Sequence, residues 1–150
     1  MNPSPLQLEF SVINNIKIDS SEAYKVDAKN PIFRDFDKAD FSSNVDVAYS
    51  EDKKKFKVKL KTWLHATELS QPPYTFEITM TGYFGVDERL TEQKGLDLVT
   101  FNGPAVLYGS IREIVFQMTS RGAFPQLVLP TVNFIQPKET KGEVESAEAK

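Results

Sequence analysis

Residues Ser120–Phe134, with the sequence SRGAFPQLVLPTVNF, mark the change from a helical to an extended pattern in this chain. The apolar positions before this stretch recur at helical spacing: Leu107, Ile111, Ile114, Val115 and Met118. Gly122 stands where a helix can end in a left-handed turn, and Pro125 and Pro130 restrict the backbone that follows. The stretch holds neither a nucleophile–base pair nor an acid/base pair, so it is not a catalytic motif.

The start of this helix is predicted at Asn102. Asparagine is a favoured N-cap residue, and Pro104 follows near the first helical position, where its missing N–H costs little. The charged segment Asp87–Val99, which contains Gly95, is predicted to be a loop.

Four segments before the helix alternate between apolar and polar residues, as half-buried antiparallel strands do. They cover residues 6–18, 45–49, 55–65 and 74–84. In the first, Ile13 interrupts the polar face, and the apolar face is predicted to hold Leu6, Leu8, Phe10, Val12, Ile16 and Ile18. The sequence therefore predicts an α+β fold, a four-stranded antiparallel sheet with a long C-terminal helix packed on or beside it. Residues 1–134 form the predicted domain, and the polar residues 135–150 are expected to be a disordered tail.

The connection Asp19–Ser43 is too long for a hairpin, and loops of this length are usually functional or disordered. Part of it is expected to pack, because it carries aromatic residues among its charges: Tyr24, Phe33, Phe36 and Phe41. Its closely spaced aspartates, Asp35, Asp37 and Asp40, lack the glycine and terminal glutamate of a calcium loop. We therefore interpret them as solvated loop residues.

Composition excludes several classes of site. Of the 150 residues 40% are hydrophobic and 26% charged, which is typical of a globular protein, and the net charge of −3 gives no general attraction to nucleic acid. The absence of cysteine excludes disulfides and thiolate chemistry, and one histidine, His65, cannot form a polyhistidine metal site. We expect no enzyme activity, no cofactor and no metal. With neither a signal peptide nor a membrane-length apolar run in the sequence, we expect a cytoplasmic protein.

A row of lysines marks the polar face of the third predicted strand. Lys55, Lys57, Lys59 and Lys61, followed by Trp63, alternate with buried positions. The row has three interpretations: a solvated face that opposes edge-to-edge aggregation, a surface for docking a partner protein, or a nucleic-acid site. The acidic net charge and the lack of arginine in the row disfavour nucleic acid.

The apolar residues of the Ser120–Phe134 stretch are divided between two expected roles. About half should complete the core, and the rest should line a groove for extended, unfolded polypeptide. The groove residues predicted from this stretch are Phe124, Leu127, Leu129, Val132 and Phe134, and the fourth predicted strand is expected to add Tyr83 and Phe84. Small residues along the helix leave room for a second helix, so a subunit interface is predicted at Tyr108, Ile111, Val115 and Phe116, although a purely intrachain role fits equally.

The segment from Asn102 to Phe134 resembles the signature of the SecB family of export chaperones. The resemblance implies an ATP-independent holdase for unfolded or precursor polypeptides, assembled as a tetramer built from two dimers, with the motor SecA as a possible partner. Two features depart from the family. Residues 135–150 are polar where members continue into a second helix, and the lysine row stands where members present acidic residues to SecA.

These departures keep other functions open. One is a dedicated chaperone of an antitoxin in a toxin–antitoxin–chaperone system. Another is an adaptor that binds one folded partner through the lysine row, and a third is a small-ligand carrier with a cavity between sheet and helix.

Overall fold

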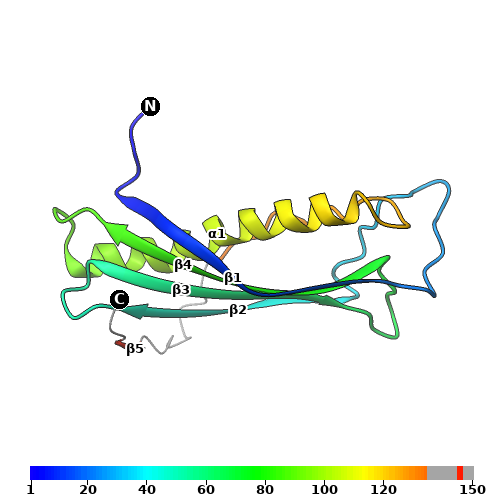
Figure 1. Cartoon of the computed structure of the whole chain (residues 1–150), viewed down its shortest axis with the longest axis horizontal. Coiled ribbons are helices and arrows are strands. Elements are labelled where there is room, and N and C mark those ends of the chain that lie inside the picture. Colours follow the sequence, from blue (N-terminus) through cyan, green and yellow to red (C-terminus); the bar gives the residue numbers. More distant parts are fainter. Residues whose placement is uncertain (135–144, 147–150) are drawn as a thin grey trace.

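A computed structural model describes residues 1–134 and 145–146 and contains one sheet and one long helix. The strands are β1 (Leu6–Ser20), β2 (Asp40–Tyr49), β3 (Lys55–His65), β4 (Tyr74–Val86) and the two-residue β5 (Glu145–Ser146). Their spatial order is β1-β4-β3-β2-β5 (Figure 1), with β5 parallel to β2 and the other pairs antiparallel. The predicted α+β fold is confirmed. The expected disorder of the tail concerns residues outside the described ones, apart from 145 and 146.

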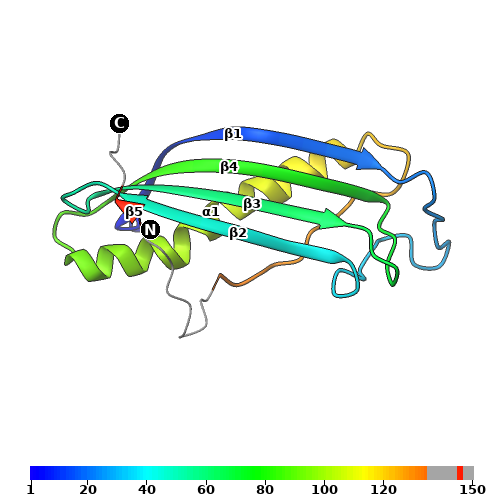
Figure 2. The ribbon, with the colours of Figure 1, turned by 90° about the horizontal axis from the view of Figure 1, so that it is seen from below.

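The helix α1 (Glu92–Thr119) covers one side of the sheet, called here the inner face, and contacts β4, β3 and β1. Figure 2 views the opposite side, the outer face, with the later turns of α1 behind the strands and its first turns beyond the β2 edge. Apolar side chains of β3 and β4 fill the space between sheet and helix, because alternate residues of a strand point to the same face. The fully buried ones are Phe56, Val58, Leu60, Leu64, Phe76, Ile78 and Phe84.

Two β-bulges divide β1 into parts that face differently. The pairing of β1 with β4 shifts after Leu8 and again after Ile13. Each extra residue turns the side chains that follow to the other face of the sheet. Phe10 and Val12 consequently lie on the outer face, whereas Ile13 lies on the inner face with Leu8. The prediction of a single apolar face for this strand is therefore wrong, and Ile13 is no exception to its pattern.

The start of α1 also differs from the prediction. The helix begins at Glu92, and the Thr91 hydroxyl caps it by accepting a hydrogen bond from the backbone N–H of Lys94. Asn102 lies inside the helix, where its side-chain amide donates to the carbonyl of Leu98. The expected loop over Asp87–Val99 is wrong beyond Thr91, since buried packing of this first part of the helix on the sheet outweighs its charged, glycine-containing composition.

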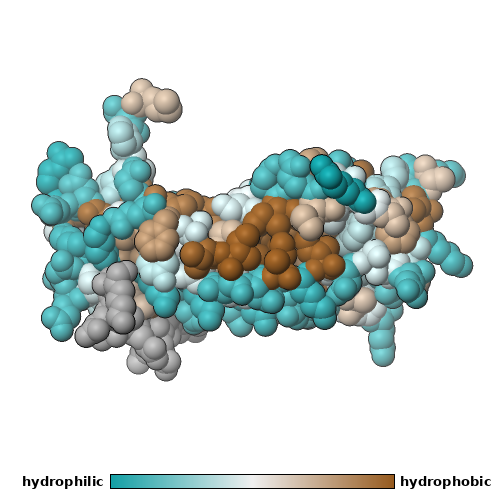
Figure 3. All heavy atoms as spheres, in the orientation of Figure 1, coloured by the Kyte–Doolittle hydropathy of each residue, from teal (hydrophilic) through white to brown (hydrophobic). Residues whose placement is uncertain are grey.

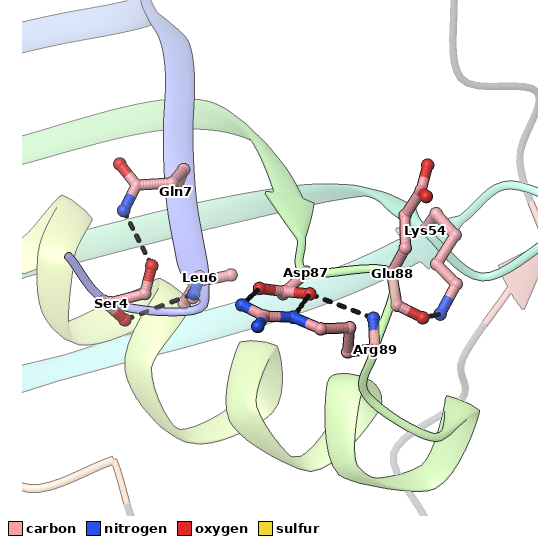
Figure 4. Close-up of polar contacts among 7 residues, drawn as sticks. All are labelled: Ser4, Leu6, Gln7, Lys54, Asp87, Glu88 and Arg89. Atoms are coloured by element: carbon pink, nitrogen blue, oxygen red, sulfur yellow. Dashed lines mark hydrogen bonds and ion pairs between the residues drawn. The ribbon is translucent and has the colours of Figure 1, made fainter.

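The turn between β4 and α1 is held by charged side chains (Figure 4). The Arg89 guanidinium and its backbone N–H both donate to the Asp87 carboxylate, and these hydrogen bonds hold the pKa of Asp87 well below its usual range. The Lys54 ammonium, from the β2–β3 hairpin, donates to the carbonyls of Glu88 and Leu90 at 3.3 and 3.0 Å. The helix therefore starts at a fixed position relative to the sheet.

Gly122 is required for a different reason from the predicted one. Its φ is not positive, and the C-cap residue Ser120 has an ordinary right-handed helical conformation. Instead, a Cβ at Gly122 would collide with the hydroxyl of Tyr74. The predicted left-handed turn is therefore wrong, and the glycine allows the chain to pass close to β4.

We predict that Gly122→Ala destabilises the protein by about 1–3 kcal/mol, because Tyr74 must move out of a packed position. Gly109→Ala is the matched control, since nothing lies within 4 Å of a Cβ built there. In the exposed part of a helix this change should stabilise by about 0.5–1 kcal/mol. Urea unfolding of both variants measures the difference, and a stable Gly122→Ala protein would contradict the close approach.

Candidate functional site

The segment that follows α1 runs back along the helix and is tied to it through backbone hydrogen bonds. The hydroxyl of Thr119 accepts from the N–H of Leu127 at 3.0 Å. The Arg112 Nε donates to the carbonyl of Leu129 at 3.2 Å, and the Tyr108 hydroxyl donates to the carbonyl of Pro130 at 2.6 Å. An extended segment outside a sheet has no neighbouring strand to hydrogen-bond with its backbone. These side chains therefore satisfy backbone groups that burial would otherwise leave unpaired.

The same segment is anchored to the sheet at its beginning. The Tyr74 hydroxyl accepts from the N–H of Phe124 at 2.8 Å and donates to the carbonyl of Phe124 at 3.0 Å. The Phe124 ring contacts both Tyr74 and Tyr24 edge-on, with centroids 5.9 and 5.2 Å apart. The chain is therefore held in place immediately after the helix ends.

Side chains of the segment alternate between core and surface. Leu127 and Leu129 are 0% and 2% exposed, whereas Val128 between them is 44% exposed. This is the alternation expected of an extended chain with one face on the core. It leaves Val128 on the surface between well-fixed neighbours.

An open groove with many apolar lining residues lies beside Val128. One hollow of about 500 Å³ separates the segment from the connection between β1 and β2, and a second of about 300 Å³ lies against α1. Val128, Leu129 and Arg112 line both hollows, so the two adjoin, and together they are called the groove here. The remaining lining residues are Ile32, Phe33, Arg34, Phe36, Gly109, Glu113, Phe116, Pro130 and Thr131.

Aromatic rings support the wall that the β1–β2 connection contributes. Phe33 is buried and meets Phe36 edge-on at 5.1 Å, and Phe36 in turn contacts Phe41 at 5.2 Å. Such contacts fix ring positions beyond what simple burial achieves. The groove thus has a fixed aromatic wall on one side and a fixed backbone on the other.

The structure places the predicted groove residues in different environments. Leu129 lines the groove, although it is almost fully buried. Phe84 and Leu127 belong to the core and cannot line a surface, which corrects that prediction. Tyr83 is also corrected, because it lies on the outer face of the sheet. The other predicted residues, Phe124, Val132 and Phe134, are half-buried and pack against the core.

The predicted interface on α1 is largely internal. Tyr108, Ile111 and Val115 are at most 4% exposed and face the sheet or the returning segment, so they cannot contact another subunit in this fold. Phe116 is half-buried and lines the groove. Helical spacing identified the apolar side of the helix correctly but not which element covers it.

The lysine row occupies the outer face. Lys55, Lys57, Lys59 and Lys61 are exposed, and Trp63 is half-buried beside them. The Lys61 ammonium lies 5.7 Å from the centre of the Trp63 ring, a cation–π distance. The groove and the lysine row are therefore on opposite sides of the sheet.

Sequence reasoning missed the contribution of Ile32 and Arg112 to the groove. The aromatic residues of the polar β1–β2 connection were the signal that could have found its wall, since they are costly to leave in water. Within residues 1–134 and 145–146 there is no cluster of three or more His, Asp or Glu side chains able to hold a metal ion. Among these residues no helix is both long and apolar enough to cross a membrane.

Comparison with known sequences identifies relatives. A family model described as the preprotein translocase subunit SecB matches residues 12–137. The protein-export protein SecB of Acinetobacter baylyi is 29% identical over 94 residues, which cover 61% of this chain and 62% of that protein. The corresponding protein of Anaplasma marginale is 27% identical over 79 residues, which cover 53% and 45%. The chain thus spans about half the length of the curated relatives it matches.

A solved structure has a similar fold. It is the SecB-like chaperone Rv1957 of Mycobacterium tuberculosis, in complex with a ChAD peptide from the Rv1956 HigA1 antitoxin. The TM-score is 0.61 at 19% identity, and the alignment covers 88% of this chain and 92% of that one. At this identity the similarity establishes the fold.

The buried hydroxyl of Tyr108, which donates to the carbonyl of Pro130, should make the stability of the protein depend on pH. Burial raises the pKa of Tyr108 to about 12. An unfolded tyrosine titrates near 10, so the unfolded state loses its proton first and the contribution of neutral Tyr108 to stability is lost as pH rises from about 10 to about 12. Tyr108→Phe should therefore lower stability by about 1 kcal/mol near neutral pH and make the alkaline decline shallower.

Urea unfolding near pH 8 and near pH 11, followed by circular dichroism, tests both parts. The control is Tyr83→Phe, which removes a hydroxyl from the outer face and should change neutral stability by less than about 0.5 kcal/mol. An unchanged alkaline slope in Tyr108→Phe would contradict the assignment.

Proposed function

The chain belongs to the SecB family, and we propose that it is an ATP-independent cytoplasmic holdase that binds non-native polypeptide in the groove beside Val128. The observation that carries the proposal is the groove formed by two adjoining hollows between the β1–β2 connection, α1 and the segment that follows it, the larger of which is lined mainly by apolar surface. No catalytic step is involved.

The groove suits extended chains of varied sequence. Its apolar side chains contribute about 25 cal/mol for each Å² of apolar surface that a client buries, and this contribution does not depend on one particular client residue. Arg112 and Glu113 lie among the apolar lining residues and can pair with polar groups of a client. An unfolded segment exposes the apolar side chains and the backbone groups that such a groove accepts.

Two classes of client remain in the proposal. The first is a range of precursor or unfolded proteins, as the family membership suggests. The second is one antitoxin, because the structurally similar mycobacterial protein was solved with an antitoxin peptide. The SecB family contacts SecA through acidic residues, which implies a basic surface on SecA. The exposed lysine row would meet that surface with the same sign of charge, which is unfavourable in close contact. The row therefore favours the second class of client over delivery to SecA.

We also propose a homo-oligomer that uses the edge of β1. The apolar side chains that this edge exposes on its inner-face side are Leu8, Ile13 and Ile16, which are 37–50% exposed. Figure 3 shows apolar surface gathered in the region that β1 crosses in Figure 1, between α1 and the outer face. Val106 of α1 is exposed as well, at 43%. Contiguous apolar surface of this kind is typical of protein interfaces.

We predict that Val128→Asp weakens client binding about tenfold, because it places a charge in the apolar groove without removing a core side chain. The measurement is suppression of light scattering by denatured citrate synthase in the absence of ATP. Leu69→Asp is the control, since Leu69 is 80% exposed in the β3–β4 connection. Equal suppression by the two variants would remove the groove assignment.

For the oligomer, Ile13→Asp should shift the protein toward smaller species in sedimentation velocity, because an interface at this edge would bury an unpaired carboxylate in an apolar contact. Leu69→Asp again provides the matched change at a site outside the β1 edge. A wild-type protein that sediments as a monomer would rule out the oligomer without affecting the groove.

A further inference from the structure

The outer face carries a column of lysines available for binding. Lys57, Lys59 and Lys61 point to the same side of β3 at every second residue, which spaces them roughly 6.6 Å apart. Lys55 pairs with the Glu9 carboxylate, but no ion pair involves the other three lysines among the described residues. Their charges are therefore not neutralised by direct contacts there.

A hollow of about 400 Å³ opens beside this column. Lys59 and Lys61 of β3, Asn15 of β1 and Thr79 of β4 line it, and Thr79 is the cross-strand neighbour of both Asn15 and Lys61. The short threonine on the central strand leaves space between longer side chains on either side. Ammonium, amide and hydroxyl groups can all donate hydrogen bonds, so the hollow suits a carboxylate. One acidic side chain, Asp46, also lines the hollow.

An apolar patch adjoins one end of the column. The rings of Phe10 and Tyr83 stack with centroids 4.3 Å apart and an interplanar angle of 16°. Tyr83 is also the cross-strand neighbour of Lys57. Phe10 is 51% exposed and Val12 43% exposed. The first bulge of β1 places both residues here, so a regular strand would not have formed the patch.

We propose that the outer face binds an extended acidic segment of a partner protein, with carboxylates at Lys59 and Lys61 and an apolar residue on Phe10 and Tyr83. In an extended chain every second side chain points the same way, at about the same 6.6 Å spacing as the lysines. Acidic residues at alternate positions therefore match the column, and an apolar residue further along reaches the patch. This surface is on the side of the sheet opposite the groove, so the inference is independent of the holdase proposal.

A peptide fits this face better than a nucleic acid does. Asp46 lies across from Lys59 and lines the same hollow, so any acidic ligand meets some repulsion there. A phosphate backbone carries a charge at every nucleotide and meets more of this repulsion than a peptide with two carboxylates does. The aromatic rings offer few free faces for base stacking, because Phe10 and Tyr83 cover each other and the Lys61 ammonium lies near Trp63. A peptide can instead place one carboxylate at each of Lys59 and Lys61 and an apolar side chain on Phe10 and Tyr83.

The test measures binding of the fluorescein-labelled peptide Gly-Phe-Ser-Glu-Ser-Glu-Ser-Gly to the full chain by fluorescence anisotropy. The double variant Lys59→Glu/Lys61→Glu should weaken binding about tenfold, equal to about 1.4 kcal/mol, by removing two attractive contacts and adding repulsion. Phe10→Ser should weaken it about threefold by losing apolar contact. Lys29→Glu/Lys94→Glu is the matched control, with the same change of charge at exposed positions outside the sheet.

Support requires saturable binding that weakens with added salt and is lost when the peptide glutamates are replaced by glutamine. The proposal is overturned if the peptide does not bind, if the control double variant is affected equally, or if labelled oligothymidylate binds more tightly than the peptide. It is also overturned if Phe10→Ser dissociates an oligomer in sedimentation velocity, since the patch would then be covered by a second copy. None of these outcomes depends on client binding in the groove, which light scattering reports separately.

Discussion

The hydrogen bonds that hold residues 124–130 against α1 and β4 are the constraint on which the rest of the structure depends. The segment is extended but lies outside the sheet, so its backbone groups need side-chain partners, and Tyr74, Thr119, Arg112 and Tyr108 supply them. With the backbone held, alternate leucines complete the core while Val128 stays at the surface. Core and groove are therefore formed by the same few residues.

The sheet separates two surfaces of different chemistry. Its inner side is covered by α1, and the groove beside the helix is apolar with aromatic support. Its outer side is a column of lysines next to the small apolar patch of Phe10 and Val12. The bulges of β1 control this division, because they decide which of its apolar side chains point to which face. An apolar client and an acidic partner would accordingly meet different sides of one sheet.

Several features followed from local patterns in the sequence and others did not. Alternation located the strands, and the lysine row was expected on a polar face because period-two patterns are local. The helix start was misplaced because Thr91 is a less obvious cap than Asn102, and only packing on the sheet makes the first turns helical. The sequence marks Gly122 as a special position, but the reason for the glycine lies in Tyr74, a residue distant in sequence.

The sequence by itself determined the α+β class, the strands, the polar lysine face and the family, since each depends on short-range periodicity or on the stretch that ends at Phe134. Only the tertiary structure decided which apolar residues are accessible. Tyr108, Ile111 and Val115 have the same spacing that a subunit interface would show, yet the sheet and the returning segment cover them. Burial depends on contacts between residues far apart in the chain, so a local pattern can mark an apolar side but cannot identify what covers it.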